Sequence, residues 1–98
     1  MSVQNFEIAE LEDTMVRNNL FEKYNLSRLG VFGSTARGEK SNDIDILIED
    51  NLDYRNLASF RDELQSLLHK RVDIVMGKYA NPIVLYRALK EIVYVIGH

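Results

Sequence analysis

The chain has 98 residues, of which 46% are hydrophobic and 28% are charged, and its formal net charge is −3. This length and composition fit one globular domain, here expected over residues 1–98, and exclude a disordered or fibrous chain. The absence of cysteine excludes disulfides, thiol catalysis and cysteine-ligated zinc.

The acidic balance argues against binding nucleic acid by bulk electrostatics, so we expect no direct nucleic-acid partner. Residues 1–27 carry five acidic and two basic side chains, whereas residues 28–98 carry ten of each sign. If three of those later acids bound cations, the remaining segment would be net basic, which suits a polyphosphate ligand.

No run of the sequence approaches the roughly 18 uncharged apolar residues that a membrane helix needs. The start, Met1 to Glu7, lacks the basic flank and apolar run of a targeting signal. These two features predict a cytoplasmic protein without a membrane partner.

Apolar residues recur at helical spacing from Asn5 to about Tyr24, which predicts an amphipathic first helix. Residues 26–32 follow as an apolar strand that ends at Gly33. Residues 34–38 are too short for more than one helical turn, and residues 39–42 form a polar turn.

The segment 43–48 predicts a second strand, in which three isoleucines share one face and Asp43 and Asp45 share the other. A helical stripe of Leu57, Phe60, Leu64 and Leu67 then runs up to His69.

Residues 71–76 predict a third strand, with Asp73 and Val75 on one face. A last helix is expected over about 83–91, with Pro82 in its first turn, and 92–96 either continue it or form a short edge strand. The resulting fold class is α/β (α+β), a small mixed sheet flanked by helices in the order αβαβαβα.

Each candidate site feature has a simpler interpretation when it is taken alone. The pair Asp43 and Asp45 could chelate a cation, or could be two exposed acids that discourage edge-to-edge sheet pairing. Gly33 and Ser34 could bind a phosphate, or could be an ordinary turn with a helix cap. We expect Asp73 to be buried, and therefore compensated either by a metal or by Lys70 or Arg71.

The predicted topology brings these features together. Gly33 and Ser34 end the first strand whereas Asp43 and Asp45 begin the second, so a shared site requires these strands to be antiparallel. The helix between the second and third strands has the length of a parallel crossover, which brings Asp73 to the same end of the sheet.

Three carboxylates beside a phosphate-binding turn are typical of phosphoryl chemistry with two divalent cations about 3.5 to 4 Å apart. Oxygen ligands and phosphate partners favour Mg²⁺, with Mn²⁺ as a substitute. The sequence thus predicts that Asp43, Asp45 and Asp73 bind two metal ions.

The run Leu29-Gly-Val-Phe-Gly-Ser-Thr-Ala-Arg-Gly-Glu39, then Asn42-Asp-Ile-Asp-Ile-Leu47 and Val72-Asp-Ile-Val75, resembles the minimal nucleotidyltransferase (MNT) family of the DNA polymerase β superfamily. The resemblance implies a polymerase β-like palm in which Asp43, Asp45 and Asp73 are catalytic metal ligands. It also implies that Gly33 and Ser34 contact nucleotide phosphates and that Arg37 shapes that turn. Arg37 is a further candidate for binding the nucleotide, although it could equally pair with Glu39 or Asp43. Members often have a longer loop with serine before the first aspartate, whereas here residues 39–42 are short and Asn42 precedes Asp43.

The resemblance further implies transfer of AMP from ATP to a hydroxyl on a partner protein, because stand-alone MNT members resemble antitoxins that adenylylate a HEPN-type ribonuclease toxin on tyrosine. A non-catalytic antitoxin that acts by direct contact is the alternative. A transferase for a small molecule or a polynucleotide ranks third, and a homo-oligomer is left open.

Overall fold

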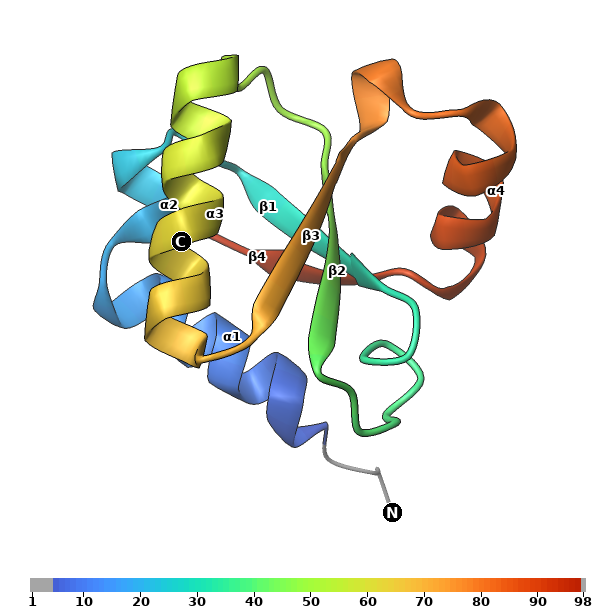
Figure 1. The fold of residues 1–98 in the computed structure, drawn as a ribbon, viewed down its shortest axis with the longest axis horizontal. Coiled ribbons are helices and arrows are strands. Elements are labelled where there is room, and N and C mark those ends of the chain that lie inside the picture. Colours follow the sequence, from blue (N-terminus) through green and yellow to red (C-terminus); the bar gives the residue numbers. More distant parts are fainter. Residues whose placement is uncertain (1–4, 98) are drawn as a thin grey trace.

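A four-stranded mixed sheet forms the centre of the computed structural model, which describes residues 5–97 (Figure 1). Residues 1–4, which belong to the start used above to exclude a targeting signal, lie outside the described part, as does residue 98. The elements in chain order are α1 (Phe6–Arg17), α2 (Leu20–Lys23), β1 (Arg28–Phe32), β2 (Asp43–Ile48), α3 (Tyr54–Leu68), β3 (Arg71–Met76), the 3-10 helix η1 (Gly77–Tyr79), α4 (Pro82–Glu91) and β4 (Val93–Ile96).

The strand order is β3-β2-β1-β4. The pairings β1–β2 and β1–β4 are antiparallel, and β2–β3 is parallel. The antiparallel first pair and the parallel crossover through α3 are both as the sequence predicts. Because of this topology, the end of β1 lies beside the starts of β2 and β3.

One face of the sheet carries the hydrophobic core. Helices α1, α2 and α3 cover this face (Figure 1), and the buried residues that they share with the strands include Leu11, Phe60, Leu64, Ile44 and Ile46. Side chains alternate between the two faces of a strand, so Asp43 and Asp45 point to the opposite face, which we call the open face. This confirms the predicted separation of the isoleucines from the aspartates.

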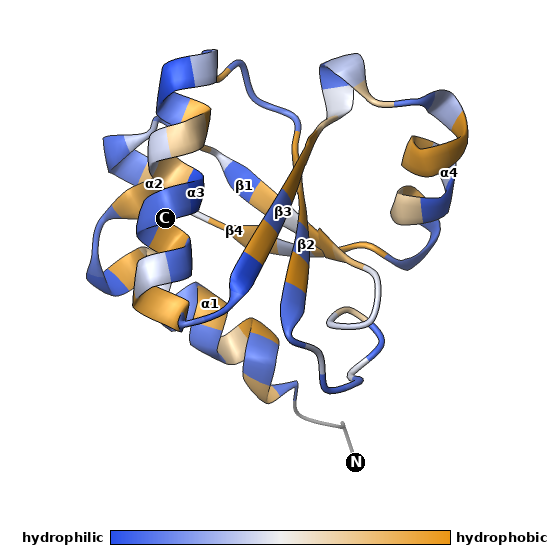
Figure 2. Ribbon diagram, in the orientation of Figure 1, coloured by the Kyte–Doolittle hydropathy of each residue, from blue (hydrophilic) through white to orange (hydrophobic). Residues whose placement is uncertain are grey.

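Helix α4 covers part of the open face. A side chain on Gly30 of β1 would overlap Ile92, which directly follows α4, and Leu47 of β2 is almost fully buried on this face. Helix α4 carries hydrophobic and hydrophilic residues (Figure 2), and its exposed large hydrophobic residues are Ile83, Val84, Tyr86 and Leu89. Near the start of β2, α4 leaves the open face uncovered.

The structure differs from the predicted elements in two details, the first helix and the buried stripe of α3. The first helix breaks at Asn18 and Asn19, because Asn19 adopts a left-handed conformation with φ of 53°. Residues 34–38 form hydrogen-bonded turns, in keeping with the expectation of no more than one helical turn, and 92–96 contain the edge strand β4, which is one of the two expected alternatives. In α3, Leu67 is exposed and Leu68 is buried, since the buried stripe follows 60, 64 and 68.

No helix in the part of the chain that the structure describes is both long and apolar enough to cross a membrane.

Candidate active site

Three residues lie in a row across the open face at one end of the sheet. Asp45 of β2 pairs with Phe32 of β1 on one side and with Asp73 of β3 on the other. Directly paired residues project to the same face, so the two carboxylates are neighbours. Asp43, two residues before Asp45, lies on this face beside Arg71.

The turn after β1 contacts this row. Gly33 has φ of 74°, and a Cβ atom built on it would lie 2.5 Å from Asp45 Oδ2. Only glycine combines this backbone conformation with so close an approach. The chain then turns back on itself, with the Arg37 amide donating to the Gly33 carbonyl at 3.2 Å and the Glu39 amide donating to the Ser34 carbonyl at 3.0 Å.

A carboxylate from α4 occupies this turn. The Gly33 amide donates to Glu91 Oε1 at 3.0 Å, and Arg37 Nη1 lies 2.9 Å from Glu91 Oε2. Arg37 also pairs with Glu39 through its Nε, at 3.0 Å. The sequence does not reveal Glu91, because it lies 54 residues from Arg37 and belongs to no motif with it.

Negative charge gathers around Asp45. Partial burial raises the pKa of Asp45, and the charges of Asp73, Asp43 and Glu91 raise it further, while Arg37 lowers it. In Glu91 the hydrogen bond from Arg37 lowers the pKa of the carboxyl, and the Gly33 amide adds to this effect. The site therefore favours a cation beside Asp45.

The expectation that Asp73 is buried is wrong. Asp73 is exposed, because α4 does not cover this end of the open face. Neither predicted compensating base pairs with it among the described residues: Lys70 Nζ lies 3.4 Å from Glu7 Oε1, and no ion pair of Arg71 is found. The Asp73 carboxylate is thus exposed to solvent and makes no ion pair within the described residues.

Although Asp43, Asp45 and Asp73 lie at the same end of the open face, they do not form a complete metal site. Within residues 5–97, no three or more histidine, aspartate or glutamate side chains lie close enough to hold a metal ion together. The donor set nevertheless fits a hard cation, because Asp43, Asp45 and Asp73 offer only carboxylate oxygens, and because partial burial, followed by the acidic neighbours, raises the pKa of Asp45. Side-chain rotation would be needed to bring the three together.

A buried threonine in the turn is a second residue that sequence reasoning missed. Thr35 is 1% exposed, and its Oγ1 donates to Glu7 Oε2 at 3.3 Å. The Asn5 side chain donates to the Thr35 carbonyl at 2.7 Å, and Ser41 Oγ donates to the Asp43 carbonyl at 2.7 Å. Helix α1 and the short 39–42 loop thus hold the turn in place against β2.

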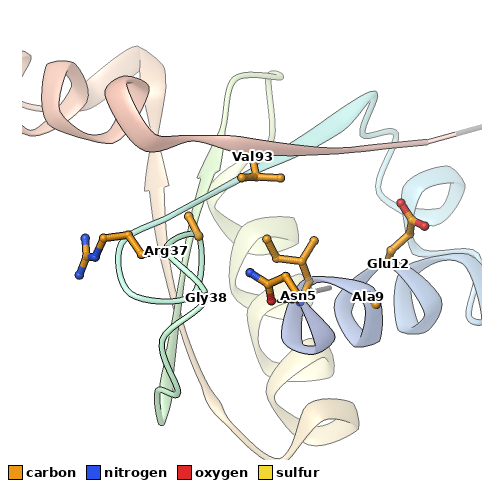
Figure 3. Close-up of a pocket in the computed structure, with 8 residues that line it drawn as sticks. Asn5, Ala9, Glu12, Arg37, Gly38 and Val93 are labelled. Carbon is orange, nitrogen blue, oxygen red and sulfur yellow. Dashed lines mark hydrogen bonds between the residues drawn. The ribbon is translucent and has the colours of Figure 1, made fainter. Parts of the chain in front are cut away.

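A cavity of about 480 Å³ lies beside the same turn but away from the carboxylates (Figure 3). Its lining includes Asn5, Ala9, Gly38 and Val93, and Val93 belongs to the core face of β4. None of the three aspartates lines it. Arg37 also lines the cavity, and in Figure 3 its guanidinium extends away from the other labelled residues.

A mixed sheet with a glycine–serine turn set against carboxylates on the next strands is the arrangement of a nucleotidyltransferase. A family model described as polymerase beta nucleotidyltransferase matches residues 17–97, and the chain belongs to this family.

Relatives that are similar along their whole length carry a more specific name. The chain is 35% identical to MJ0128 of Methanocaldococcus jannaschii, named as a candidate protein adenylyltransferase, over 90% of this chain and 97% of that protein. It is 32% identical to the protein adenylyltransferase MntA of Thermococcus cleftensis, over 97% of this chain and all of that protein.

A crystal structure of a toxin–antitoxin complex with AMP-PNP contains a chain with the same fold. Its TM-score is 0.69 at 26% identity, covering 89% of this chain and 73% of that one. The polymerase β-like fold expected from the sequence is thereby confirmed.

Proposed function

We propose that this protein transfers AMP from ATP to a hydroxyl group on a partner protein, with Asp43, Asp45 and Asp73 as the catalytic carboxylates. The observation that carries the proposal is the contact of Gly33 with Asp45, since the turn that we propose to bind phosphate lies directly against this carboxylate. The protein adenylyltransferase relatives support the choice of reaction.

In this reaction the acceptor oxygen attacks the α-phosphorus of ATP. A new oxygen–phosphorus bond forms, the bond from the α-phosphorus to the bridging oxygen breaks, and pyrophosphate leaves, while the hydroxyl proton passes to a neighbouring aspartate carboxylate. The Gly33 amide and the Ser34 hydroxyl would hold the phosphates, and Arg37 would balance their charge. Phosphoryl transfer of this kind depends mainly on such positioning and electrostatics.

The three aspartates would hold Mg²⁺, with two ions in the bound state and Mn²⁺ as a substitute. When bound, the metal supplies positive charge that offsets the carboxylates and the triphosphate. The protein's own contribution is to place Asp45 and Asp73 directly opposite one another across the parallel pair β2–β3.

The partner that we propose is a HEPN-type toxin, in keeping with the MNT resemblance and with the toxin–antitoxin complex among the similar structures. The partner would present the acceptor hydroxyl to the carboxylates on the open face. We further propose that the protein acts in the cytoplasm.

The test uses labelled ATP, Mg²⁺, the purified protein and the product of the neighbouring gene. We expect label on the partner, and no label with the double variant Asp43→Asn, Asp45→Asn. Retained transfer by that variant would contradict the mechanism. If the same variant neutralised the partner fully without labelling it, the protein would act by contact instead.

A further inference from the structure

We propose that Glu91 competes with the nucleotide: its carboxylate occupies the Gly33 amide and Arg37 in the nucleotide-free protein and must leave before a phosphate can bind there. Glu91 would thereby set the affinity for ATP. This inference rests on the proposed function, because it assumes that the turn after β1 is the phosphate site.

The geometry places both oxygens of one carboxylate on the two donors in question. Oε1 accepts from the Gly33 amide at 3.0 Å, and Oε2 lies 2.9 Å from Arg37 Nη1. A carboxylate and a phosphate present similar pairs of oxygens to a backbone amide and a guanidinium. Glu91 and a phosphate therefore cannot both use these donors.

The charges around the contact also oppose simultaneous binding. Glu91 is close enough to Asp45 to contribute to the charge there, and Asp73 and Asp43 carry negative charge on the same face. A phosphate held at Gly33 would bring further negative charge to this place. The repulsion is relieved if the Glu91 carboxylate turns away.

Glu91 is free to make this movement. It is the last residue of α4, its side chain is 32% exposed, and the helix has a single buried residue among those described, Ala88. Rotation of the side chain into solvent would release both donors without a change in the backbone. Exposed ion pairs contribute little to stability, so an incoming triphosphate can displace this one.

Glu39 provides a matched control, because it makes the other ion pair of Arg37. Its Oε2 lies 3.0 Å from Arg37 Nε, and its exposure is similar to that of Arg37. The Gly33 amide donates to Glu91 and not to Glu39. Removing the charge of Glu39 frees one side of Arg37 but leaves the amide occupied.

The experiment measures the dissociation constant of ATP with Mg²⁺ by calorimetry for the wild-type protein, Glu91→Gln and Glu39→Gln. Glu91→Gln should bind ATP up to about fivefold more tightly, the range expected when one exposed charged contact is removed. Glu39→Gln should change affinity by a smaller factor. In the transfer assay Glu91→Gln should lower the KM for ATP.

An unchanged or weaker affinity of Glu91→Gln, with wild-type binding intact, would overturn the role of Glu91 and leave the proposed function standing. Weaker binding would mean that Glu91 positions Arg37 for the nucleotide. Absence of ATP binding in all three proteins would overturn both proposals. Should Glu91→Gln fail to fold, Glu91→Asp, which keeps the charge but shortens the reach, must also bind ATP more tightly than the wild type.

Discussion

Gly33 and Asp45 are in such close contact that a side chain at Gly33 would displace the Asp45 carboxylate, since its Cβ would lie 2.5 Å from Asp45 Oδ2. The turn and the carboxylates therefore form one unit, although the two residues belong to different elements.

The variants Gly33→Ala and Gly38→Ala separate the effect of this contact from backbone strain. Both glycines have positive φ, of 74° and 79°, but a Cβ at Gly38 would meet nothing within 4 Å. Each variant should lose about 1 kcal/mol of unfolding free energy from strain. Gly33→Ala should lose more and should also impair ATP binding, as measured by denaturant unfolding and calorimetry. Equal effects of the two variants would contradict the contact.

Asp45→Asn should stabilise the protein in the absence of nucleotide and metal while abolishing transfer. The folded-state pKa of Asp45 is raised above the unfolded value of 3.8. Between these two pKa values the native state binds more protons than the unfolded state, so stability falls as the pH rises from the lower to the higher value. Asparagine does not ionise, so the Asp45→Asn variant does not lose this stability as the pH rises. We expect a melting temperature higher by a few degrees at pH 7, and a smaller difference near pH 3.5. A lower melting temperature at pH 7 would contradict the view that burial and the acidic neighbours destabilise the charged Asp45 carboxylate.

Asp73→Asn should reduce transfer on the order of 100-fold, as the loss of one group that stabilises developing charge commonly does. Its stability should change by less than about 0.5 kcal/mol, because Asp73 is exposed. Asp62→Asn is the control, since Asp62 is also exposed but pairs with Arg61 on α3. Asp62→Asn should leave both transfer and stability unchanged, and a similar loss of activity there would point to a general effect of charge.

Glu63 contributes stability that depends on pH. The hydrogen bond from Lys23, and then that from Tyr24, lowers the pKa of Glu63, so its contribution is present above the unfolded value of 4.5 and is lost as the pH falls through the folded value. Glu63→Gln should be less stable than the wild type at pH 7 by less than about 1 kcal/mol, and this difference should shrink as the pH falls below 4.5. Asp13→Asn, which breaks the more exposed pair with Arg17, should show a smaller difference in thermal melts.

The strands that carry the aspartates were predictable to the residue. The bounds Asp43–Ile48 and Arg71–Met76 agree with the structure because alternating side chains, with a period of two, mark both the faces and the ends of a strand. The first helix was predicted as continuous, because its apolar spacing passes through Asn18 and Asn19. The left-handed conformation of Asn19 leaves no trace in that spacing.

The sequence by itself determined that Asp43 and Asp45 share one face and that the Gly33–Ser34 turn meets them, since both follow from local periodicity and from short connections. Only the tertiary structure decided that Asp73 is exposed, because exposure depends on how far α4 extends over the open face. It also decided that Glu91 reaches Gly33, a contact between residues 58 positions apart. Such contacts arise from packing of distant elements, which no local pattern records.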